Sequence, residues 1–581
     1  MSDSAADRSG FRRVPAWLAV LAPAVLLAAH LALLAASVSR KCATVDEFVH
    51  VPSGVYYWQT GDFSLSGLNP PLAKLFAALP VLAMNPKMPI ALPPGERAAE
   101  YPWAFGRLFM LKNWDAYDAM LFRSRATTML LSVLAGLALF LWARRLTGFW
   151  PALLALALYA FEPNVIAHGR LATQDTAMML LFVVTLAALN GVIERGGWWR
   201  VFALGVTLGA ACLVKFSGLL LVLAVPLALA ACVLFVGGFR LPLAVPGEGR
   251  FRGGRPRASW QALVAVVAAV VVALLVINAV YGFSGSFQRV DPSACRSSAM
   301  KSLASGPLGV LPVPLPRVFV AGLDGQQASV EQGESTNYLN GQWSATGWWY
   351  YYLEAFALKT PLPVMVLVLA GVVSVFVVPV ERKAAMWVAA ATAGLFWAMH
   401  SFGANKQIGL RYMLPLFPLA FMLAGRAALM IPKLSGRARA IGAVALVLLA
   451  GWTAADAAVI FPDYLAYFNP LAGGPDGGPR YLLDSNIDWG QDLPALADYL
   501  KREGITGRVY MGYFGEVAPE LYGIKPRNAV PGAIGTVIVS ANFLYGMPYG
   551  GFKPGDFEWL RLRKPDAIIG HTLYVYRTDQ R

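Results

Sequence analysis

The first 460 residues alternate between long apolar runs and short polar connectors. About 20 apolar residues cross a hydrocarbon core that is roughly 30 Å thick, and eleven runs are candidates for such spans. The pattern therefore predicts a polytopic α-helical membrane protein with about eleven transmembrane helices. The candidate spans lie near residues 14–38, 126–143, 150–166, 175–193, 199–213, 217–236, 260–281, 361–379, 385–400, 412–430 and 440–460.

Two long polar loops interrupt this pattern, at about residues 40–125 and 283–357. The first contains the stretch NPKMPIALPPGER, which cannot form a continuous helix because proline lacks a backbone N–H and clashes with the preceding turn. The second is rich in Gly, Ser, Gln and aromatic residues. Its Trp343, Trp348 and Trp349 could shape a ligand pocket, although tryptophan belts at membrane interfaces are the commoner explanation.

Beyond residue 460 the hydrophobic runs shorten to a few residues, namely YLLD, RVYMGYF, TVIVSANF, DAIIG and LYVYR. One amphipathic helix candidate, Leu493–Glu503, lies among them. Strand-like runs that alternate with helical ones indicate a small α/β domain. The chain is thus expected to divide into a transmembrane domain over residues 1–460 and an α/β domain over residues 461–581.

The basic residues of the connectors set the expected orientation. Cations are frequent in every second connector and sparse in the others, which is the positive-inside pattern of cytoplasmic loops. The N-terminus is then cytoplasmic, the first run is an uncleaved span, and both long loops and the C-terminal domain lie outside. The cations that set this pattern are Arg8, Arg12, Arg13, Arg144, Arg145, Arg195, Arg200, Arg240, Arg250, Arg252, Arg255, Arg257, Arg382, Lys383, Lys433, Arg437 and Arg439.

The amino-acid composition also indicates a membrane protein, and the distribution of charge indicates which molecules it contacts. The chain is 57% hydrophobic and 14% charged, whereas soluble domains average about 25% charged residues. Much of the net charge of +15 lies in connectors, so it predicts contact with anionic lipid headgroups rather than with nucleic acid. The four cysteines are too few for a disulfide framework or a zinc site, although Cys42 and Cys295 would share the outer side and could pair.

The expected topology gathers the dense polar clusters on the outer side. Carboxylates at the edge of a bilayer are costly to keep dry and are usually there for a function. Because the orientation follows from the opposite connectors alone, this convergence supports both the topology and a site. The candidate residues are Asp46, Glu47, His50, Asn69 and Lys74 of the first loop, with Arg170, Asp175, Lys215, Lys406, Arg411 and Tyr412 of the short outer connectors.

Asp46 and Glu47 are adjacent, so on a helix they point about 100° apart and cannot both face one atom. One could act as a base while the other holds a partner or a metal. Asp46 and His50 are four residues apart and would share a helix face. The alternative is a structural helix start, in which Thr44 or Asp46 caps backbone N–H groups and Glu47 complements the helix dipole.

The basic candidates also allow two interpretations. Arg170 and Asp175 could form a structural ion pair, and Lys406 and Arg411 could reach along the apolar surface toward lipid headgroups. A sugar–phosphate lipid, however, requires cations at the membrane boundary, and arginine offers two parallel hydrogen bonds to a phosphate.

Several motifs together resemble the protein O-mannosyltransferase superfamily, which includes the bacterial aminoarabinose transferases of lipid A. DEFVH, the G-D-F turn and PPLAK are similar to its first loop, and HGRLATQDTAM is similar to its second outer loop. LVKFSGL resembles its Lys segment, and IGLRYMLPLFP resembles its R-Y-x-L-P-x-x-P segment. FNPLAGGPDGG and LLDSNIDWGQDLPALADYL are similar to the C-terminal region of a bacterial branch, so the resemblance covers about residues 40–505.

The resemblance implies a GT-C-type fold in a bacterial inner membrane. It also implies inverting transfer of a sugar from a polyprenyl-phosphate-linked donor to an extracytoplasmic glycan, lipid or protein acceptor. Asp46 would be the base or its orienter with Glu47 beside it, and Asp175 would support the acceptor or the first loop. The residues implied to bind the donor phosphate or the substrate are His50, Asn69, Lys74, Arg170, Lys215, Lys406, Arg411 and Tyr412.

The chain departs from the family pattern at Asn69, where relatives commonly carry His or Glu before Pro-Pro. Asn is a poor metal ligand and does not titrate near neutral pH, so participation of a divalent metal is left open. The competing hypotheses are a transporter or flippase of lipid-linked sugars and a non-catalytic scaffold for envelope assembly. The lack of internal repeats and the scarcity of ionisable residues within the spans argue against a carrier.

Overall fold

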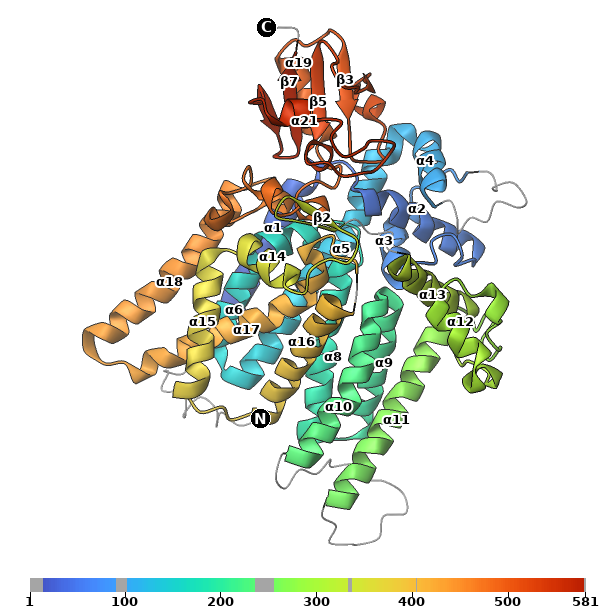
Figure 1. Ribbon diagram of the computed structural model, residues 1–581. Coiled ribbons are helices and arrows are strands. Elements are labelled where there is room, and N and C mark those ends of the chain that lie inside the picture. Colours follow the sequence, from blue (N-terminus) through green and yellow to red (C-terminus); the bar gives the residue numbers. More distant parts are fainter. Residues whose placement is uncertain (1–13, 90–101, 236–254, 333–336, 404, 579–581) are drawn as a thin grey trace.

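The computed structural model describes residues 14–89, 102–235, 255–332, 337–403 and 405–578. Within them, seven helical segments are long and apolar enough to cross a membrane. Figure 1 shows the helices packed side by side, with the C-terminal sheet at one end of the bundle. The seven segments contain α1 (Ala16–Val38), α5 (Tyr117–Thr147), α8 (Asp175–Arg195), α10 (Leu219–Phe235), α11 (Arg255–Val280), α17 (Phe417–Gly425) with its flanking 3-10 turns, and α18 (Gly436–Val459).

Two further pairs of helices pass the same test together but are bent, by 63° and by 116°. With these pairs the described residues hold up to nine spans, and the protein is a multi-pass helical membrane protein. Two of the eleven expected spans, near residues 199–213 and 385–400, fall on helices that are shorter or less apolar, so their crossing of the membrane stays a prediction. The bent pairs are α6 (Phe149–Phe161) with α7 (Pro163–Gly169) and α14 (Tyr351–Lys359) with α15 (Leu362–Val377); the remaining two helices are α9 (Trp198–Val214) and α16 (Lys383–Phe402).

Connectors that were expected on the cytoplasmic side meet at one end of the bundle. Glu194 of α8 accepts hydrogen bonds from Arg145, at the end of α5, and from Arg382, just before α16. Asp175 lies at the other end of α8, which is 21 residues and therefore about 31 Å long. The ion pairs at Glu194 are thus separated from Asp175 by roughly the thickness of a bilayer.

The first long loop folds into three helices near the C-terminal sheet, namely α2 (Val45–Thr60), α3 (Leu72–Leu82) and α4 (Pro102–Lys112) (Figure 1). α2 and α3 approach each other closely, because a Cβ atom on Gly54 would lie 2.1 Å from the carbonyl oxygen of Lys74. Only glycine fits at this crossing, which holds the two helices of the loop in one fixed arrangement.

The second long loop covers part of the first. Gln326 Nε2 donates a hydrogen bond to the carbonyl oxygen of Leu68 (2.6 Å), and a Cβ atom on Gly322 would lie 2.1 Å from the carbonyl oxygen of Gly67. The two loops therefore form one packed layer at this end of the bundle. The second loop contains α12 (Ser298–Ser305), α13 (Arg317–Glu331) and an antiparallel hairpin of β1 (Asn337–Leu339) and β2 (Gln342–Ser344).

The C-terminal region forms a five-stranded mixed sheet in the order β4-β3-β5-β7-β6. Four of the five short hydrophobic runs became strands, and the amphipathic candidate became α19 (Leu493–Arg502). YLLD was wrong as a strand, because its leucines are buried in an irregular segment before a 3-10 turn. The strands are β3 (Val509–Gly512), β4 (Arg527–Asn528), β5 (Thr536–Ser540), β6 (Ala567–Ile569) and β7 (Leu573–Arg577).

Two buried clusters join the C-terminal region to the start of the chain. In one, Leu34 of α1 packs with Trp489 and Val537. In the other, Phe48 of α2 packs with Val509 of β3. The C-terminal sheet thus shares its core with the first loop, and a domain boundary at residue 460 stays a prediction.

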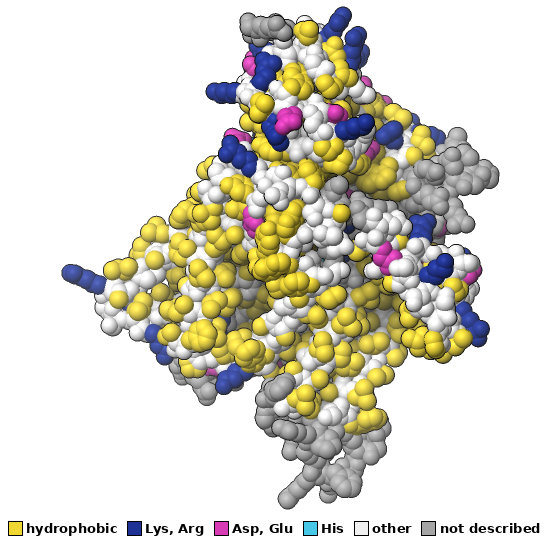
Figure 2. All heavy atoms as spheres, viewed as in Figure 1, with side chains coloured by type: hydrophobic (Ala, Val, Ile, Leu, Met, Phe, Trp, Pro, Cys, Tyr) yellow, Lys and Arg dark blue, Asp and Glu magenta, His cyan; other side chains and the backbone are white. Residues whose placement is uncertain are grey.

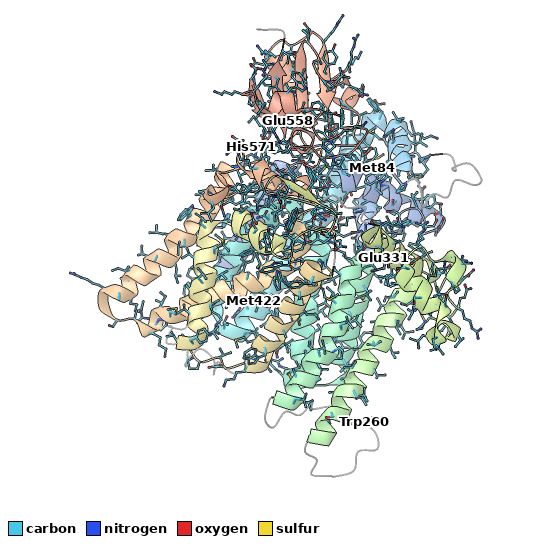
Figure 3. All side chains as sticks on the ribbon, in the orientation of Figure 1. Met84, Trp260, Glu331, Met422, Glu558 and His571 are labelled. Carbon is cyan, nitrogen blue, oxygen red and sulfur yellow. The ribbon has the colours of Figure 1, made fainter. Side chains whose placement is uncertain are left out.

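Hydrophobic and charged side chains occupy different parts of the surface. Figure 2 shows hydrophobic side chains over the helical part of the visible face, while Lys and Arg gather near its two ends. In Figure 3, Trp260 lies near the far end of α11, and His571 lies beside the C-terminal sheet. An apolar band between polar ends is the surface expected of a protein that spans a bilayer.

Candidate functional site

The Asp46–Glu47 pair lies in the first turn of α2, which begins at Val45 with Thr44 as its N-cap. Glu47 Oε2 accepts hydrogen bonds from the backbone N–H of Thr44 (3.0 Å) and from its Oγ1 (2.9 Å). The structural interpretation of this segment as a helix start is therefore correct for Glu47. Asp46 contacts different neighbours, as the angle between adjacent helical positions requires.

Glu47 belongs to a closed hydrogen-bond network with Arg125 of α5. Arg125 donates from Nε to Oε1 and from Nη2 to Oε2, both at 2.7 Å, and the backbone N–H of Ala172 donates to Oε1 (2.8 Å). Burial would raise the pKa of Glu47, but Arg125 and the hydrogen bonds outweigh it and lower the pKa. Glu47 is charged and its side chain is 0% exposed. The other guanidinium hydrogens of Arg125 bind the carbonyl oxygens of Val38, Lys41 and Cys42.

Asp46 pairs with a cation from a distant segment of the chain, and that cation leads to a second ion pair. Arg411 Nη1 donates to Asp46 Oδ2 (2.6 Å) and lies 3.7 Å from Asp175 Oδ2. Lys215 Nζ donates to Asp175 Oδ1 (2.8 Å). Asp46, Arg411, Asp175 and Lys215 therefore form one alternating row of charges, called the charge row below.

The charge row is accessible at its two ends. The side chains of Asp46 and Lys215 are 25% and 15% exposed, whereas those of Arg411 and Asp175 are 8% and 2% exposed. Burial would raise the pKa of Asp46, but Arg411 and, less strongly, His50 overcome that effect and lower it. Asp46 is thus an ionised carboxylate that a molecule outside the protein can reach.

Aromatic rings cover both cations. The Arg411 guanidinium lies 4.2 Å from the ring centroid of Trp489 and 5.4 Å from that of Tyr412. Lys215 Nζ lies 4.3 Å from the centroid of the same Tyr412 ring. The rings attract the cations through their negative faces and exclude water, which strengthens the remaining charge interactions. Tyr412, a sequence-predicted site residue, therefore lies at the charge row.

His50 lies next to the charge row on the same face of α2 as Asp46. Burial is the main cause that lowers its pKa to about 4, and Lys74 and Arg411 act in the same direction against the attraction of Asp46. His50 is therefore neutral at pH 7. Its buried Nδ1 has no hydrogen-bond partner within the described part of the chain.

Other sequence-predicted residues lie away from the charge row. Arg170 donates to the carbonyl oxygen of Ser37 (3.1 Å) and lies over the ring of Tyr464. The suggested Arg170–Asp175 ion pair does not form, because Asp175 pairs with Lys215 instead. The guanidinium of Arg170 binds the last turn of α1, so the structure does not bring it to Lys215 and Arg411.

Lys74 and Asn69 belong to the support of the first loop. Lys74 Nζ donates to the carbonyl oxygens of Ser66 (2.7 Å) and Asn69 (3.0 Å), and its side chain is buried. The amide oxygen of Asn69 accepts a hydrogen bond from Gln326 of α13 (3.3 Å). Both residues thereby fix the turn that precedes α3. Lys406 lies on the segment before Arg411 and is half-buried.

Sequence reasoning missed three residues that shape this site. Arg125 closes the network of Glu47, and Trp489 covers Arg411. Asp484 interacts electrostatically with Arg411, and burial raises its pKa to about 6. Asp484 and Trp489 both belong to the polar stretch DSNIDWGQD, whose density of Asp, Asn and Gln within an apolar chain was the available signal.

The cysteines are unpaired in the described structure. Cys42 and Cys295, which could have formed a disulfide, are both free. Cys42 is buried and donates from Sγ to the carbonyl oxygen of Gly490 (3.1 Å). Among the described residues, no group of three or more His, Cys, Asp and Glu side chains is arranged to hold a metal ion.

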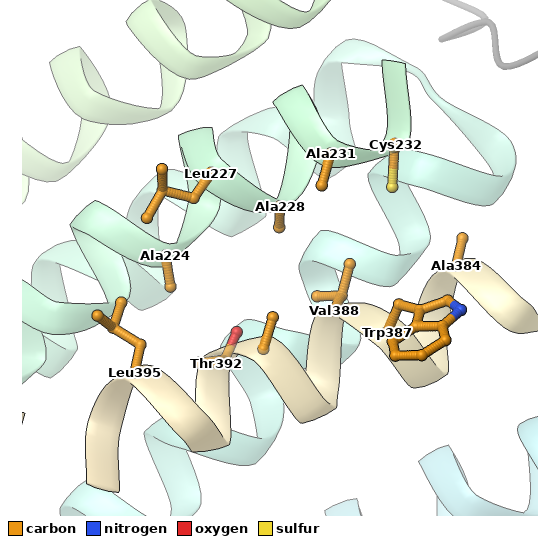
Figure 4. A pocket seen from close by; sticks show the side chains of 11 residues that line it. Ala224, Leu227, Ala228, Ala231, Cys232, Ala384, Trp387, Val388, Thr392 and Leu395 are labelled. Carbon is orange, nitrogen blue, oxygen red and sulfur yellow. The ribbon is translucent and has the colours of Figure 1, made fainter. Parts of the chain in front are cut away.

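An apolar cavity of about 500 Å³, open at the surface, lies between α10 and α16 (Figure 4). Ala224 of α10 and Leu395 of α16 line one end, and Cys232 and Trp387 line the other. Ala224 lies in the second turn of α10, and a single 3-10 turn (Phe216–Gly218) separates α10 from Lys215 of the charge row.

Residues 118–238 match the sequence profile of the dolichyl-phosphate-mannose-protein mannosyltransferase family. The resemblance found in the motifs is confirmed over this stretch. It contains HGRLATQDTAM and LVKFSGL, and thus Asp175 and Lys215 of the charge row. The expected glycosyltransferase class and the expected lipid-phosphate partner agree with this family. No curated protein matches the chain.

Several solved structures are similar to the chain. ArnT from Cupriavidus metallidurans bound to undecaprenyl phosphate is 13% identical with a TM-score of 0.46, over 95% of this chain and 97% of ArnT. The Pmt1-Pmt2 complex of S. cerevisiae bound to the sugar donor is 11% identical with a TM-score of 0.45, over 78% of this chain and 90% of the other. AglB from Archaeoglobus fulgidus, in complex with an inhibitory peptide and a dolichol-phosphate, is 10% identical with a TM-score of 0.47, over 95% of this chain and 75% of AglB.

Proposed function

We propose that the protein is an inverting membrane glycosyltransferase, which moves a sugar from a polyprenyl-phosphate-linked donor to an extracytoplasmic hydroxyl acceptor. The charge row carries this proposal. It combines a reachable carboxylate, Asp46, with two cations, Arg411 and Lys215, at the end of a bundle of membrane helices. The match of residues 118–238 to a mannosyltransferase family supports the same reaction class.

The proposed reaction needs a proton acceptor and a site for an anion. The acceptor oxygen forms a bond to the anomeric carbon, and its proton passes to Asp46. The bond between the anomeric carbon and the phosphate oxygen breaks, and its electron pair stays on the polyprenyl phosphate. Because negative charge grows on that phosphate, Lys215 and Arg411 stabilise the transition state more than the bound donor. The leaving phosphate is stable as an anion, so no general acid is required.

Asp175 and Glu47 are assigned supporting roles in this proposal. Asp175 is 2% exposed and contacts both cations, so it holds Lys215 and Arg411 in place. The carboxylate oxygens of Glu47 accept hydrogen bonds from Arg125, Thr44 and Ala172. Asp46 is therefore proposed as the base. Glu47 is proposed to fix the first turn of α2, which contains Asp46.

The cavity between α10 and α16 suits the isoprenoid tail of the donor. Its lining is formed almost entirely by Ala, Leu, Val and Trp side chains, which match a hydrocarbon chain, and Thr392 is the one described residue of the lining with a hydroxyl group. A tail in this cavity would bring its phosphate toward Lys215, at the start of the segment that leads into α10. One lipid could then occupy both features.

The orientation follows from the same assignment. The charge row and the C-terminal sheet lie at the end of the bundle opposite Glu194, where connectors rich in cations meet. We propose that the Glu194 end faces the cytoplasm and that the charge row faces the outer side. Donor and acceptor would then meet outside the cell's inner membrane.

The test uses purified protein in lipid vesicles with a panel of radiolabelled polyprenyl-phosphate sugars. Donor consumption is followed for the wild type, for Asp46→Asn, and for Asp62→Asn as a control in the same loop, where Asp62 is exposed. We expect Asp46→Asn to lower turnover by about 10²- to 10⁴-fold, with only a small fall in unfolding temperature, and Asp62→Asn to stay near wild type.

Two results would contradict the proposal. Full turnover by Asp46→Asn would exclude this carboxylate as the base. Movement of intact donors across the vesicle membrane, with no consumption by the wild type, would favour a flippase. The same vesicles report both quantities, because donor that has crossed the bilayer can be distinguished from donor that has lost its sugar.

A further inference from the structure

The segment from Asp484 to Gln491, here called the brace, reaches from the C-terminal region to the charge row. The backbone N–H of Val45, the residue before Asp46, donates to the carbonyl oxygen of Trp489 (3.1 Å). The backbone N–H of Leu410, the residue before Arg411, donates to the side-chain oxygen of Asn486 (2.9 Å). The brace therefore holds the backbone on both sides of the Asp46–Arg411 ion pair.

Two further contacts repeat this pattern. The backbone N–H of Cys42 donates to the carbonyl oxygen of Gln491 (3.0 Å), and Ser485 Oγ donates to the carbonyl oxygen of Ile408 (2.5 Å). Each side of the ion pair is thus bound to the brace at two points. Since Asp46 and Arg411 are 365 residues apart in sequence, this common support fixes their separation.

The brace is itself held firmly. Gln491 accepts a hydrogen bond from the backbone N–H of Trp489 (2.7 Å) and donates to the carbonyl oxygen of Ile487 (2.9 Å). Gly490 has φ of +81°, and a Cβ atom there would lie 2.6 Å from the carbonyl oxygen of Phe514. A side chain at this position would displace the turn, so glycine is required for its tight packing.

Trp489 is the residue of the brace whose side chain contacts Arg411. Its ring centroid lies 4.2 Å from the Arg411 guanidinium, and the residue is 2% exposed. The ring of His168 packs edge-on against Trp489 at 6.2 Å, which limits its rotation. Arg411 Nε has no hydrogen-bond partner within the described chain, so its orientation depends on Asp46, Asp175 and the aromatic faces.

We propose that Trp489 is a positioning residue that holds Arg411 on Asp46, and that the C-terminal region acts in the reaction through this contact. The inference rests on the proposed function, because it assigns the ion pair to the reaction. Trp489 itself touches neither the sugar nor the phosphate in this assignment. Its ring keeps the guanidinium in one orientation and excludes water from it.

The test compares Trp489→Leu with the conservative Trp489→Phe. A matched control is Trp559→Leu, which removes a half-buried tryptophan of the C-terminal region whose Nε1 donates to Asp556. We expect Trp489→Leu to lower kcat per folded molecule about ten- to thirtyfold, the range of a desolvated cation–π contact. Trp489→Phe should restore most of the rate, and Trp559→Leu should retain it.

A pH profile separates positioning from a merely structural role. Asp46 is faced by Arg411, His50 and Asp175, with Lys74 and Asp484 nearby. Arg411 and His50 hold its pKa below the ordinary value, so a displaced Arg411 lets the pKa rise. We therefore expect the acid limb of kcat/KM to move to higher pH in Trp489→Leu. An acid limb of kcat/KM that stays at the wild-type pH in Trp489→Leu would overturn the proposal, and so would the same shift in Trp559→Leu.

A double-mutant cycle keeps the inference testable without turnover. Unfolding midpoints are measured for the wild type, Asp46→Asn, Trp489→Leu and the double variant. If Trp489 holds Arg411 on Asp46, Asp46→Asn should shift the midpoint less in the Trp489→Leu background than in the wild type. Additive shifts would overturn the proposal. A wild type that consumes no donor would refute the proposed function alone, since the cycle is read from unfolding.

Discussion

Asp46 and Glu47 are neighbouring carboxylates with opposite surroundings. Both are ionised, and each pairs with an arginine. Glu47 is enclosed with its partner Arg125, and their side chains are 0% and 1% exposed. Asp46 keeps a quarter of its side chain exposed, while its partner Arg411 is shared with Asp175. The same chemical group is therefore enclosed at one position and reachable at the next.

The difference shows how a helix start can serve structure and chemistry together. Successive residues of α2 point about 100° apart, so one side chain can close the helix end while the other faces the charge row. The rigidity of the enclosed network at Glu47 fixes the backbone that carries Asp46. Catalytic groups gain from such fixed positions, because misplacement by even 1 Å is costly to the rate.

The largest expected loss of stability comes from breaking the buried Glu47–Arg125 ion pair. Glu47→Gln leaves the buried Arg125 guanidinium without its counter-charge, and loss of one partner of a buried ion pair costs about 3–5 kcal/mol. We expect a correspondingly lower free energy of unfolding in detergent, measured by denaturant titration. Asp46→Asn makes the same change in charge at a quarter-exposed position, where about 1 kcal/mol or less is expected. Equal losses in the two variants would contradict the comparison.

A smaller effect is expected from the cation at the open end of the charge row. Lys215→Met removes a charged hydrogen-bond donor from the proposed phosphate site, and such bonds contribute about 1.5–3 kcal/mol. kcat/KM for the lipid-phosphate donor should fall about ten- to hundredfold, through a lower kcat as well as a higher KM, with a smaller change in unfolding. Lys301→Met, which alters an exposed lysine of α12, is the control and should leave KM unchanged. Unchanged donor binding in Lys215→Met would remove this residue from the phosphate site.

The smallest effect expected is a shift in the pH dependence. The pKa of Asp46 is lowered in the folded protein, so the deprotonated form persists below the ordinary aspartate range of about 3.9. The ion pair therefore stabilises the fold above that range and is lost as the pH falls through the lowered pKa. Turnover should stay level from about pH 7 to pH 5, and Arg411→Gln should move the acid limb upward. An acid limb above pH 5 in the wild type would contradict the assignment.

The sequence predicted much of the helical frame and part of the site. Apolar runs and alternating cations placed the spans, and strand-like runs placed β3, β5, β6 and β7. The spacing of Asp46, Glu47 and His50 predicted their directions on a helix, because local geometry alone determines them. The outer connectors also predicted that Asp175, Lys215 and Arg411 would converge.

Partners could not be predicted, because they depend on packing between distant segments. Nothing local distinguishes Arg125, which closes the Glu47 network, from Arg170, which was expected at the site and binds the carbonyl oxygen of Ser37. Trp489 was read only as part of a family motif, although its ring determines the surroundings of Arg411. YLLD has the composition of a strand but lies in the irregular segment before the brace.

The position of the brace near the end of the chain sets the order in which the site can be assembled during synthesis. Asp46, Asp175 and Arg411 are synthesised in that order, and residues 484–491 follow only after the last candidate span. A chain that ends with the last candidate span lacks Trp489, so of the two rings beside Arg411 only that of Tyr412 is present. The surroundings of Arg411 are therefore complete only when the C-terminal region has packed against the first loop, and a chain that ends before the brace has an incomplete charge row environment.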